Sequence, residues 1–234
     1  MDAELGYMGP VMVFDLDDTL YAEADFVLSG FRAVSHMAIQ YRPVTSAETW
    51  YQLMKQAWLS GRNAFDALSE EVAPTDTESF IKSCVDTYRF HKPSISLSDS
   101  AVLLLSTLAA KGIRMSVITD GRSRTQRAKI KSLGLERYIG VTDILISEEL
   151  GAEKTSIDGW RKIVSRYPNA SQFIYIGDNP AKDFYWPRRL GWRTFGLRDH
   201  GKNIHKQTGD FPPGHMPEIW IDDLSEIISL IAKY

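Results

Sequence analysis

The stretch VMVFDLDDTLY, from Val11 to Tyr21, runs from an apolar segment directly into three carboxylates within four positions. A short apolar run that ends in polar residues is typical of a buried parallel strand whose carboxyl end reaches a loop. Carboxylates this close repel one another, so we expect a cation or a proton to accompany them. The stretch therefore predicts a first strand followed by a charged site.

Similar short apolar runs recur along the chain and predict further strands. They span Met115 to Thr119, Val141 to Ile146, Phe173 to Gly177, Arg193 to Leu197 and Ile219 to Ile221. Helical patterns lie between most of these runs and close the chain, at Ser100 to Lys111, Ser123 to Leu133, Ser156 to Tyr167, Ala181 to Leu190 and Leu224 to Lys233. Strands that alternate with helices predict an α/β fold with a doubly wound parallel sheet of the Rossmann-like kind.

One segment breaks this alternation, because residues 22 to 93 show helical patterns and no strand pattern. Aromatic and aliphatic side chains there recur three and four positions apart, as on the buried face of a helix. They include Phe26, Phe31, Val34, Met37, Ala38, Tyr41, Trp50, Leu53, Met54, Ala57 and Trp58. We predict a small inserted α-helical domain over residues 21–93, within a core domain formed by residues 1–20 and 94–234.

Composition excludes several classes of protein. A net charge of -3 in 234 residues and a pI near 6.0 argue against nucleic-acid binding, which needs a surplus of Lys and Arg. Cys84 is the single cysteine and cannot form an internal disulfide, and the first residues are acidic where a signal peptide is basic. The most apolar stretch, Ala101 to Ile113, falls short of the ~20 residues of a bilayer span. We expect a cytoplasmic protein with no membrane partner.

Residues with reactive side chains stand at the ends of the predicted strands. In an open parallel sheet, ligands bind outside the carboxyl ends of the strands, and neighbouring strands lie ~5 Å apart. We therefore expect side chains from different strand ends to converge. The residues concerned are Asp15 and Asp17 after the first strand, Thr119, Asp120 and Gly121 after the second, Lys154 beyond the third, and Asp178 and Asp183 after the fourth.

Three or four carboxylates without a His or Cys ligand set form an oxygen-rich site, which suits a hard cation such as Mg²⁺ better than zinc. The cation would offset the repulsion among the aspartates. Together with Lys154 it would screen an incoming phosphate dianion, which a carboxylate nucleophile could not otherwise approach. The residues thus indicate phosphate chemistry.

Four segments, "FDLDDT", "TDG", "EKT" and "GDNPAKD", follow one another in this order. They resemble the four motifs of the haloacid dehalogenase-like (HAD) superfamily, whose members are mostly Mg²⁺-dependent phosphatases. The resemblance covers essentially the whole chain, and the helical insert resembles the small cap that the family places after its first strand. Two positions depart from the family pattern. Thr155 stands where Pro usually follows the lysine, and Asp120 stands where Asn is common, so its charge would be unwelcome if it faced a phosphate.

The resemblance implies roles for the residues of the first two motifs. Asp15 would be the nucleophile that forms an aspartyl-phosphate intermediate. Asp17 would protonate the leaving oxygen and then activate water, which requires its proton affinity to be raised by burial or a neighbouring charge. Thr119 and the backbone of Asp120 and Gly121 would hold phosphate oxygens.

The last two motifs complete the implied site. Lys154 would neutralise the phosphate and the nucleophile. The side chains of Asp15 and Asp178 and the backbone carbonyl of Asp17 would hold Mg²⁺. Asp183 would reach the ion through water or orient Lys154.

The resemblance therefore predicts a Mg²⁺-dependent phosphatase that acts on a small phosphorylated metabolite, such as a sugar phosphate or a nucleotide. Asp17 favours phosphoryl transfer, because the branches of the family that cleave carbon–halogen or carbon–phosphorus bonds lack an aspartate there. Two alternatives stay open: a phosphomutase acting on a sugar phosphate, and a non-catalytic module that binds Mg²⁺ and phosphate. The sequence is compatible with a monomer or a homodimer.

Several other residues carry weaker expectations. The basic residues after Gly121 are interpreted as a solvated helix face, with Arg122 or Arg124 as possible phosphate contacts; they are Arg122, Arg124, Arg127, Lys129 and Lys131. Arg198 to Pro217 is predicted to be a surface loop whose residues His200, His205 and His215 are structural or solvent-facing. Cys84 is expected to be a buried small hydrophobe. Candidates for contact with the substrate's leaving group are Tyr21, Phe26, Arg62, Arg89 and His91.

Overall fold

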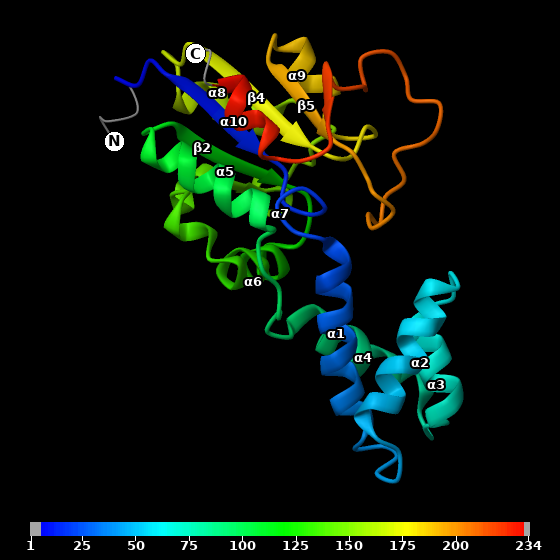
Figure 1. The fold of residues 1–234 in the computed structure, drawn as a ribbon. Helices are drawn as coiled ribbons and strands as arrows, with labels where there is room; N and C mark the ends of the chain where they lie inside the picture. Colours follow the sequence, from blue (N-terminus) through cyan, green and yellow to red (C-terminus); the bar gives the residue numbers. More distant parts are fainter. Residues whose placement is uncertain (1–5, 232–234) are drawn as a thin grey trace. The chain divides into compact units, whose positions relative to one another are not determined.

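The fold of residues 6–231 is described by a computed structural model. Six strands of this part of the chain form one parallel sheet in the order β3-β2-β1-β4-β5-β6 (Figure 1). The strands are β1 (Pro10–Phe14), β2 (Arg114–Thr119), β3 (Ile144–Ile146), β4 (Gln172–Gly177), β5 (Arg193–Leu197) and β6 (Ile219–Ile221). The α-helices are α1 (Glu23–Ala38), α2 (Ala47–Leu59), α3 (Ala64–Val72), α4 (Thr77–Phe90), α5 (Asp99–Ala110), α6 (Ser123–Leu133), α7 (Ser147–Leu150), α8 (Asp158–Arg166), α9 (Tyr185–Arg189) and α10 (Glu226–Ile231), and two 3-10 turns, η1 and η2, span Leu135–Arg137 and Val141–Asp143.

The strand order confirms the predicted doubly wound α/β fold. Strands β2 and β3 lie on one side of β1 within the sheet, and β4, β5 and β6 lie on its other side. Val13 therefore pairs with Ser116 of β2 and with Tyr175 of β4. Because the order reverses between β1 and β4, the carboxyl ends of these strands border the crevice where such sheets bind ligands.

Helix α8 covers one face of the sheet with aromatic and aliphatic side chains. Its Trp160 is fully buried and meets the ring of Tyr175 edge to face, with 4.9 Å between the ring centroids. The Trp160 indole N–H donates to the carbonyl oxygen of Lys154 at 2.9 Å. Helices α5 and α10, which contact each other, lie together on one side of the sheet (Figure 1). Packing in the core thus anchors the backbone at Lys154.

Residues Ala24–Ile95 form a second compact unit, separate from the unit that contains the sheet. Helices α2, α3 and α4 begin at N-cap residues Ser46, Asn63 and Asp76, whose side chains accept backbone N–H hydrogen bonds. Their apolar faces bury a core of their own in which Cys84 is fully buried, as expected. The role of this unit as a cap remains a prediction. Along residues 6–231, no helix has both the length and the apolar character that a bilayer span requires.

Three predicted elements differ from the structure. Residues Val141–Asp143 form the 3-10 turn η2 instead of strand, because the Asp143 amide bonds back to the Gly140 carbonyl at 2.8 Å. The helix expected from Ala181 is shorter and begins at Tyr185, since the preceding residues turn back on Asn179 through hydrogen bonds to its carbonyl and side chain. The last helix spans Glu226–Ile231, and residues 232 and 233 of its predicted range lie outside the described residues.

Candidate active site

A cavity of about 110 Å³ opens in the sheet unit at the carboxyl ends of β1, β2 and β4. Six of the residues predicted from the sequence line it: Asp15, Asp17, Thr119, Asp120, Lys154 and Asp178. The side chain of Asp183 is fully buried beside it, and Gly121 is outside the lining. The structure therefore brings together residues that are separated by up to 163 positions in the chain (from Asp15 to Asp178).

Lys154 connects two of the buried carboxylates. Its ammonium group lies 2.6 Å from Asp15 Oδ1 and 2.7 Å from Asp183 Oδ1, and its side chain is 4% exposed. Tyr175 donates its hydroxyl hydrogen to the same Asp183 oxygen at 3.0 Å. Burial alone would lower the pKa of Lys154, but the charges of Asp15 and Asp183 outweigh it and raise the pKa. Lys154 is therefore a permanent cation in the site.

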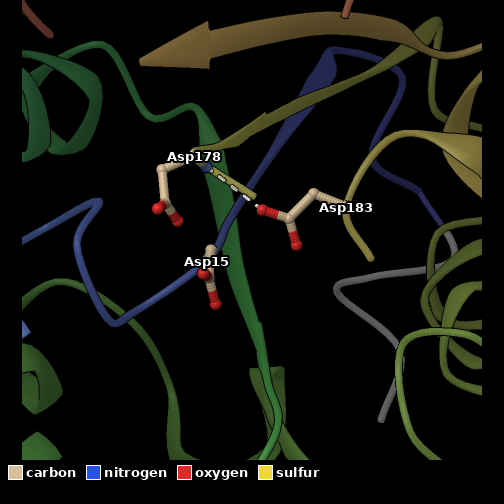
Figure 2. Close-up of side chains that lie close together, drawn as sticks. All are labelled: Asp15, Asp178 and Asp183. Carbon is tan, nitrogen blue, oxygen red and sulfur yellow. Dashed lines mark hydrogen bonds between the residues drawn. The ribbon is translucent and has the colours of Figure 1, made fainter. Parts of the chain in front are cut away.

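Figure 2 shows the carboxylates of Asp15, Asp178 and Asp183 gathered where β1 and β4 end. Each offers one oxygen, and these oxygens all lie within 4.8 Å of one another. Asp183 Oδ2 also accepts the backbone N–H groups of Asp178 and Asn179 at 3.1 and 2.9 Å. Its oxygens thus join Lys154 to the loop after β4.

These carboxylates carry more negative charge than Lys154 balances. Burial, together with repulsion from Asp183, raises the pKa of Asp15 to about 8, although Lys154 opposes the shift. Burial followed by repulsion from Asp183 and Asp15 raises the pKa of Asp178 to about 9. A proton or a cation must relieve this repulsion. Because every donor in the cluster is a carboxylate oxygen, the residues fit a hard divalent ion such as Mg²⁺.

Asp178 also accepts hydrogen bonds from uncharged side chains. Asn203 donates its amide N–H to Asp178 Oδ2 at 2.8 Å, and the hydroxyl of Thr19 approaches Oδ1 at 3.4 Å. Gln207 donates to the Asp178 carbonyl oxygen at 2.8 Å. Asn203 and Gln207 belong to the segment predicted only as a surface loop, so that interpretation missed its part in the site. Its composition predicts a loop, and nothing in its pattern indicates these partners.

Two further residues of the same loop, Ile204 and His205, lie at the cavity. The Ile204 amide donates to Asp18 Oδ2 at 2.9 Å, while Asp18 Oδ1 accepts the Glu23 amide at the start of α1 at 2.7 Å. Asp18 therefore ties two loops together and does not join the acidic cluster. His205 is exposed, as expected of a solvent-facing residue, but it also lines the cavity, which the sequence did not indicate.

Asp17 has partners on both of its carboxylate oxygens. Lys129 lies 2.7 Å from Oδ1, Gln126 donates to Oδ2 at 2.9 Å, and Tyr21 donates its hydroxyl hydrogen to Oδ1. Burial would raise the pKa of Asp17, but the charge of Lys129 and these hydrogen bonds outweigh it and lower the pKa. The expectation that burial or a neighbouring charge raises the proton affinity of Asp17 is therefore wrong, because the neighbouring charge is the cation of Lys129. Lys129 also lies 3.8 Å from Glu23 Oε1.

The position of Lys129 corrects the interpretation of the basic run as a solvated face. Lys129 is only 3% exposed, and Gln126, one turn earlier on α6, is 2% exposed. The signal that could have found them is their spacing, because residues three apart share one helix face and α6 starts directly after the TDG motif. Arg127, by contrast, pairs with Glu149. Neither Arg122 nor Arg124 is among the residues that line the cavity.

The second motif is held in place by side chains around it. Gln126 donates to Thr119 Oγ1 at 2.7 Å. The Asp120 carboxylate accepts the Lys154 backbone N–H at 2.9 Å and lies 3.2 Å from the Lys182 ammonium group, which balances its charge. Gly121, at φ 144°, donates its N–H to Ser147 Oγ at 2.9 Å.

Four of the five candidates for substrate contact, Tyr21, Phe26, Arg62 and His91, make other interactions in the structure. Tyr21 binds Asp17, as described above. Within the helical unit, Arg62 pairs with Glu70 at 2.9 Å. The His91 ring lies 2.6 Å from the Tyr88 carbonyl oxygen and 3.1 Å from Ser29 Oγ, and Phe26 packs edge to face on the Tyr88 ring.

Comparison with known proteins defines the family. Residues 12–197 match the haloacid dehalogenase-like hydrolase family, and the chain belongs to that family. Glyceraldehyde 3-phosphate phosphatase of Methanocaldococcus jannaschii is 27% identical over 230 residues, which cover 95% of this chain and 96% of the relative.

Solved structures share the fold at lower identity. YfnB of Bacillus subtilis, described as a HAD-hydrolase bound to magnesium, superposes with a TM-score of 0.65 at 21% identity, over 96% of this chain and 99% of YfnB. A 2-haloacid dehalogenase of Pseudomonas syringae reaches a TM-score of 0.59 at 20% identity, over 97% and 99% of the two chains. The fold alone does not distinguish phosphatases from dehalogenases, so the side chains of the site must carry that distinction.

Proposed function

We propose that the protein is a Mg²⁺-dependent phosphatase that hydrolyses a small phosphorylated metabolite, a sugar phosphate or a nucleotide, through an aspartyl phosphate at Asp15. The observation that carries the proposal is that the buried Asp15 and Lys154 and the half-buried Asp17 line one cavity. The relative from Methanocaldococcus jannaschii is named a phosphatase, which favours phosphoryl transfer over dehalogenation. Asp17 points the same way, because breaking a carbon–halogen bond needs no proton donor for the leaving group.

The proposed reaction has two displacements at phosphorus. A carboxylate oxygen of Asp15 forms a bond to phosphorus while the bond to the leaving oxygen breaks, and Asp17 gives that oxygen a proton. Asp17 then takes a proton from water, whose oxygen attacks phosphorus and releases Asp15 with inorganic phosphate. The donors on both oxygens of Asp17 support a fixed orientation of its carboxyl group, but they also favour its ionised form. The negative charge of an incoming phosphate would have to raise the proton affinity of Asp17 for the acid step.

Positive charge and hydrogen-bond donors must surround the phosphoryl oxygens. Lys154, at 2.6 Å from Asp15, would neutralise both the nucleophile and the phosphate. Thr119 and the backbone N–H groups of Asp120 and Gly121 would bind phosphoryl oxygens. Gly121 would have to exchange its hydrogen bond to Ser147 for one to the phosphate. The Asp120 carboxylate is neutralised by Lys182, which removes the objection to a charged residue at this position.

The side chains of Asp15 and Asp178 and the backbone carbonyl of Asp17 are the proposed Mg²⁺ ligands. Asp183 would hold Lys154 and the loop after β4, or reach the ion through water. When bound, Mg²⁺ supplies charge neutralisation and polarisation of phosphoryl oxygens. The oxygen-only cluster and its excess negative charge support this assignment. Cytoplasmic location, a monomeric or homodimeric state and the cap role of the helical unit are kept as predictions from the sequence.

The test is release of inorganic phosphate by purified protein and Mg²⁺ from a panel of phosphate monoesters. The panel spans aryl phosphates, sugar phosphates and nucleotides, and the matched control is Asp15→Asn, which keeps the size of the side chain. We expect turnover of at least one monoester by the wild type and none by the variant. Absence of turnover across the panel would overturn the proposal. A mutase would instead convert a sugar phosphate to an isomer without free phosphate, and a binding module would retain ligand without any product.

A further inference from the structure

We propose that Gln126 and Lys129 of α6 are positioning residues that hold the carboxyl group of Asp17 in line for proton transfer to the leaving oxygen. The inference rests on the proposed phosphatase function and adds two residues that none of the four motifs contains. It predicts that substrates whose leaving group needs a proton depend on these residues more than substrates whose leaving group does not.

The contacts account for both oxygens of Asp17. Lys129 holds Oδ1 at 2.7 Å and Gln126 holds Oδ2 at 2.9 Å, so the plane of the carboxyl group is fixed by two donors from one helix face. Tyr21 adds a third donor on Oδ1. A side chain held at two atoms cannot rotate about its last bond without losing a hydrogen bond, and proton transfer needs the donor within hydrogen-bond reach of the leaving oxygen.

The burial of Lys129 and Gln126 supports a role at this site. A lysine loses hydration and side-chain freedom when it is buried, and only close pairing compensates for the loss. Lys129 is 3% exposed, with the carboxylates of Asp17 and Glu23 at 2.7 and 3.8 Å. Lys131, two positions further on the same helix, is exposed. The buried lysine therefore faces the cavity end of the sheet, where the proposed proton donor lies.

Gln126 also sets the distance between the proton donor and the phosphate site. Its amide nitrogen has two hydrogens and bonds to Asp17 Oδ2 at 2.9 Å and Thr119 Oγ1 at 2.7 Å. Because the Thr119 oxygen accepts from Gln126, its own hydrogen remains available for a phosphoryl oxygen. One amide thus orients both the group that binds phosphate and the group that protonates the leaving oxygen.

A merely structural role for these residues makes a different prediction. If Lys129 and Gln126 only attach α6 to the first loop, their loss would reduce turnover of all substrates together. If they position Asp17, their loss would matter most where the leaving oxygen must be protonated as it departs. The parameter kcat/KM isolates this step, because it includes only events up to release of the leaving group.

The experiment compares kcat/KM for 4-nitrophenyl phosphate, whose leaving group departs as a stable anion, with kcat/KM for the alkyl phosphate that the wild type hydrolyses best. The variants are Lys129→Met and Gln126→Met, with Lys129→Arg as conservative rescue and Lys131→Met as the exposed control. General acid catalysis contributes roughly 100-fold or more. We expect Lys129→Met and Gln126→Met each to lower the alkyl value at least about 10-fold more than the aryl value. Lys129→Arg should restore most of the difference, and Lys131→Met should change neither value.

Equal losses on the two substrates, or no loss, would overturn the inference while leaving the phosphatase assignment intact. Inactivity of the wild type on every monoester would overturn the proposed function and the inference with it. Circular dichroism of each variant checks folding, and if Lys129→Met does not fold, Gln126→Met decides the matter alone, since it replaces a neutral side chain by one of similar size.

Discussion

Replacing Lys154 by methionine should destabilise the metal-free protein strongly at high pH and weakly at low pH. The Lys154 ammonium group lies 2.6 Å from Asp15 and 2.7 Å from Asp183, and its side chain is 4% exposed. Removing one partner of such a buried pair costs about 3–5 kcal/mol, because the other charge stays buried without compensation. With a urea m-value of about 3 kcal/mol/M, this loss moves the unfolding midpoint down by about 1 to 1.7 M.

The pH dependence follows from linkage. Burial raises the pKa of Asp15 to about 8 in the wild type although Lys154 opposes the shift, so without Lys154 this pKa rises further above that of the unfolded chain, which is about 4. A group whose folded pKa is raised contributes its full stability below the unfolded pKa and loses it as pH rises through the folded pKa. Below about pH 8 Asp15 keeps its proton in both proteins, so the variant's deficit should be small near pH 6 and should grow as the pH rises above 8.

The assay is urea unfolding in EDTA, followed by far-UV circular dichroism at pH 6 and pH 9.5, with the exposed Lys111→Met as control. The double variant Lys154→Met with Asp183→Asn should recover part of the deficit at pH 9.5, because one of the unpaired charges is gone. A deficit below about 1 kcal/mol at pH 9.5 would contradict this prediction, since an exposed ion pair is worth no more than that. A deficit that is equal at both pH values would refute it as well.

Two further predictions concern metal and pH. Mg²⁺ should raise the melting temperature more at pH 8 than at pH 6, because it competes with protons for the carboxyl groups of Asp15 and Asp178. Burial raises the pKa of these groups to about 8 and about 9. Calorimetry measures the shift, and an Asp178→Asn variant that responded like the wild type would contradict the prediction. Burial lowers the pKa of His91 in the helical unit, so stability should fall as pH drops below about 6.5, where the unfolded chain takes up the proton first. Thermal melts of His91→Gln should lack this part of the acid sensitivity, and an unchanged pH profile would count against it.

Much of the site could be predicted because it obeys a topological rule. Asp15, Thr119 and Asp178 each follow an apolar run, and the ends of parallel strands meet whatever their distance along the chain. Lys154 needed the order of the motifs as well, since a single lysine after a short strand is usually solvated. The convergence of these residues in one cavity confirms the expectation drawn from the strand ends.

The remaining residues depend on contacts that the sequence pattern does not contain. Lys129 lies 112 positions from Asp17, and its place among other basic residues favours a solvated face until the orientation of α6 is known. Asn203 lies in a loop without periodicity, so its hydrogen bond to Asp178 has no local signal. Hydrogen bonds to Gly140 and Asn179 likewise override the patterns that predict strand and helix after them.

If the protein works as proposed, Asp15 becomes phosphorylated during turnover, and this intermediate can be trapped. Protein and a phosphate monoester are mixed with Mg²⁺, quenched in acid within one turnover and digested, and the peptides are examined by mass spectrometry. We expect one added phosphoryl group on the peptide that contains Asp15, removed by hydroxylamine as an acyl phosphate is, and absent from Asp15→Asn. Phosphate on another residue, or a turnover-competent enzyme with no phosphorylated peptide at any quench time, would contradict it.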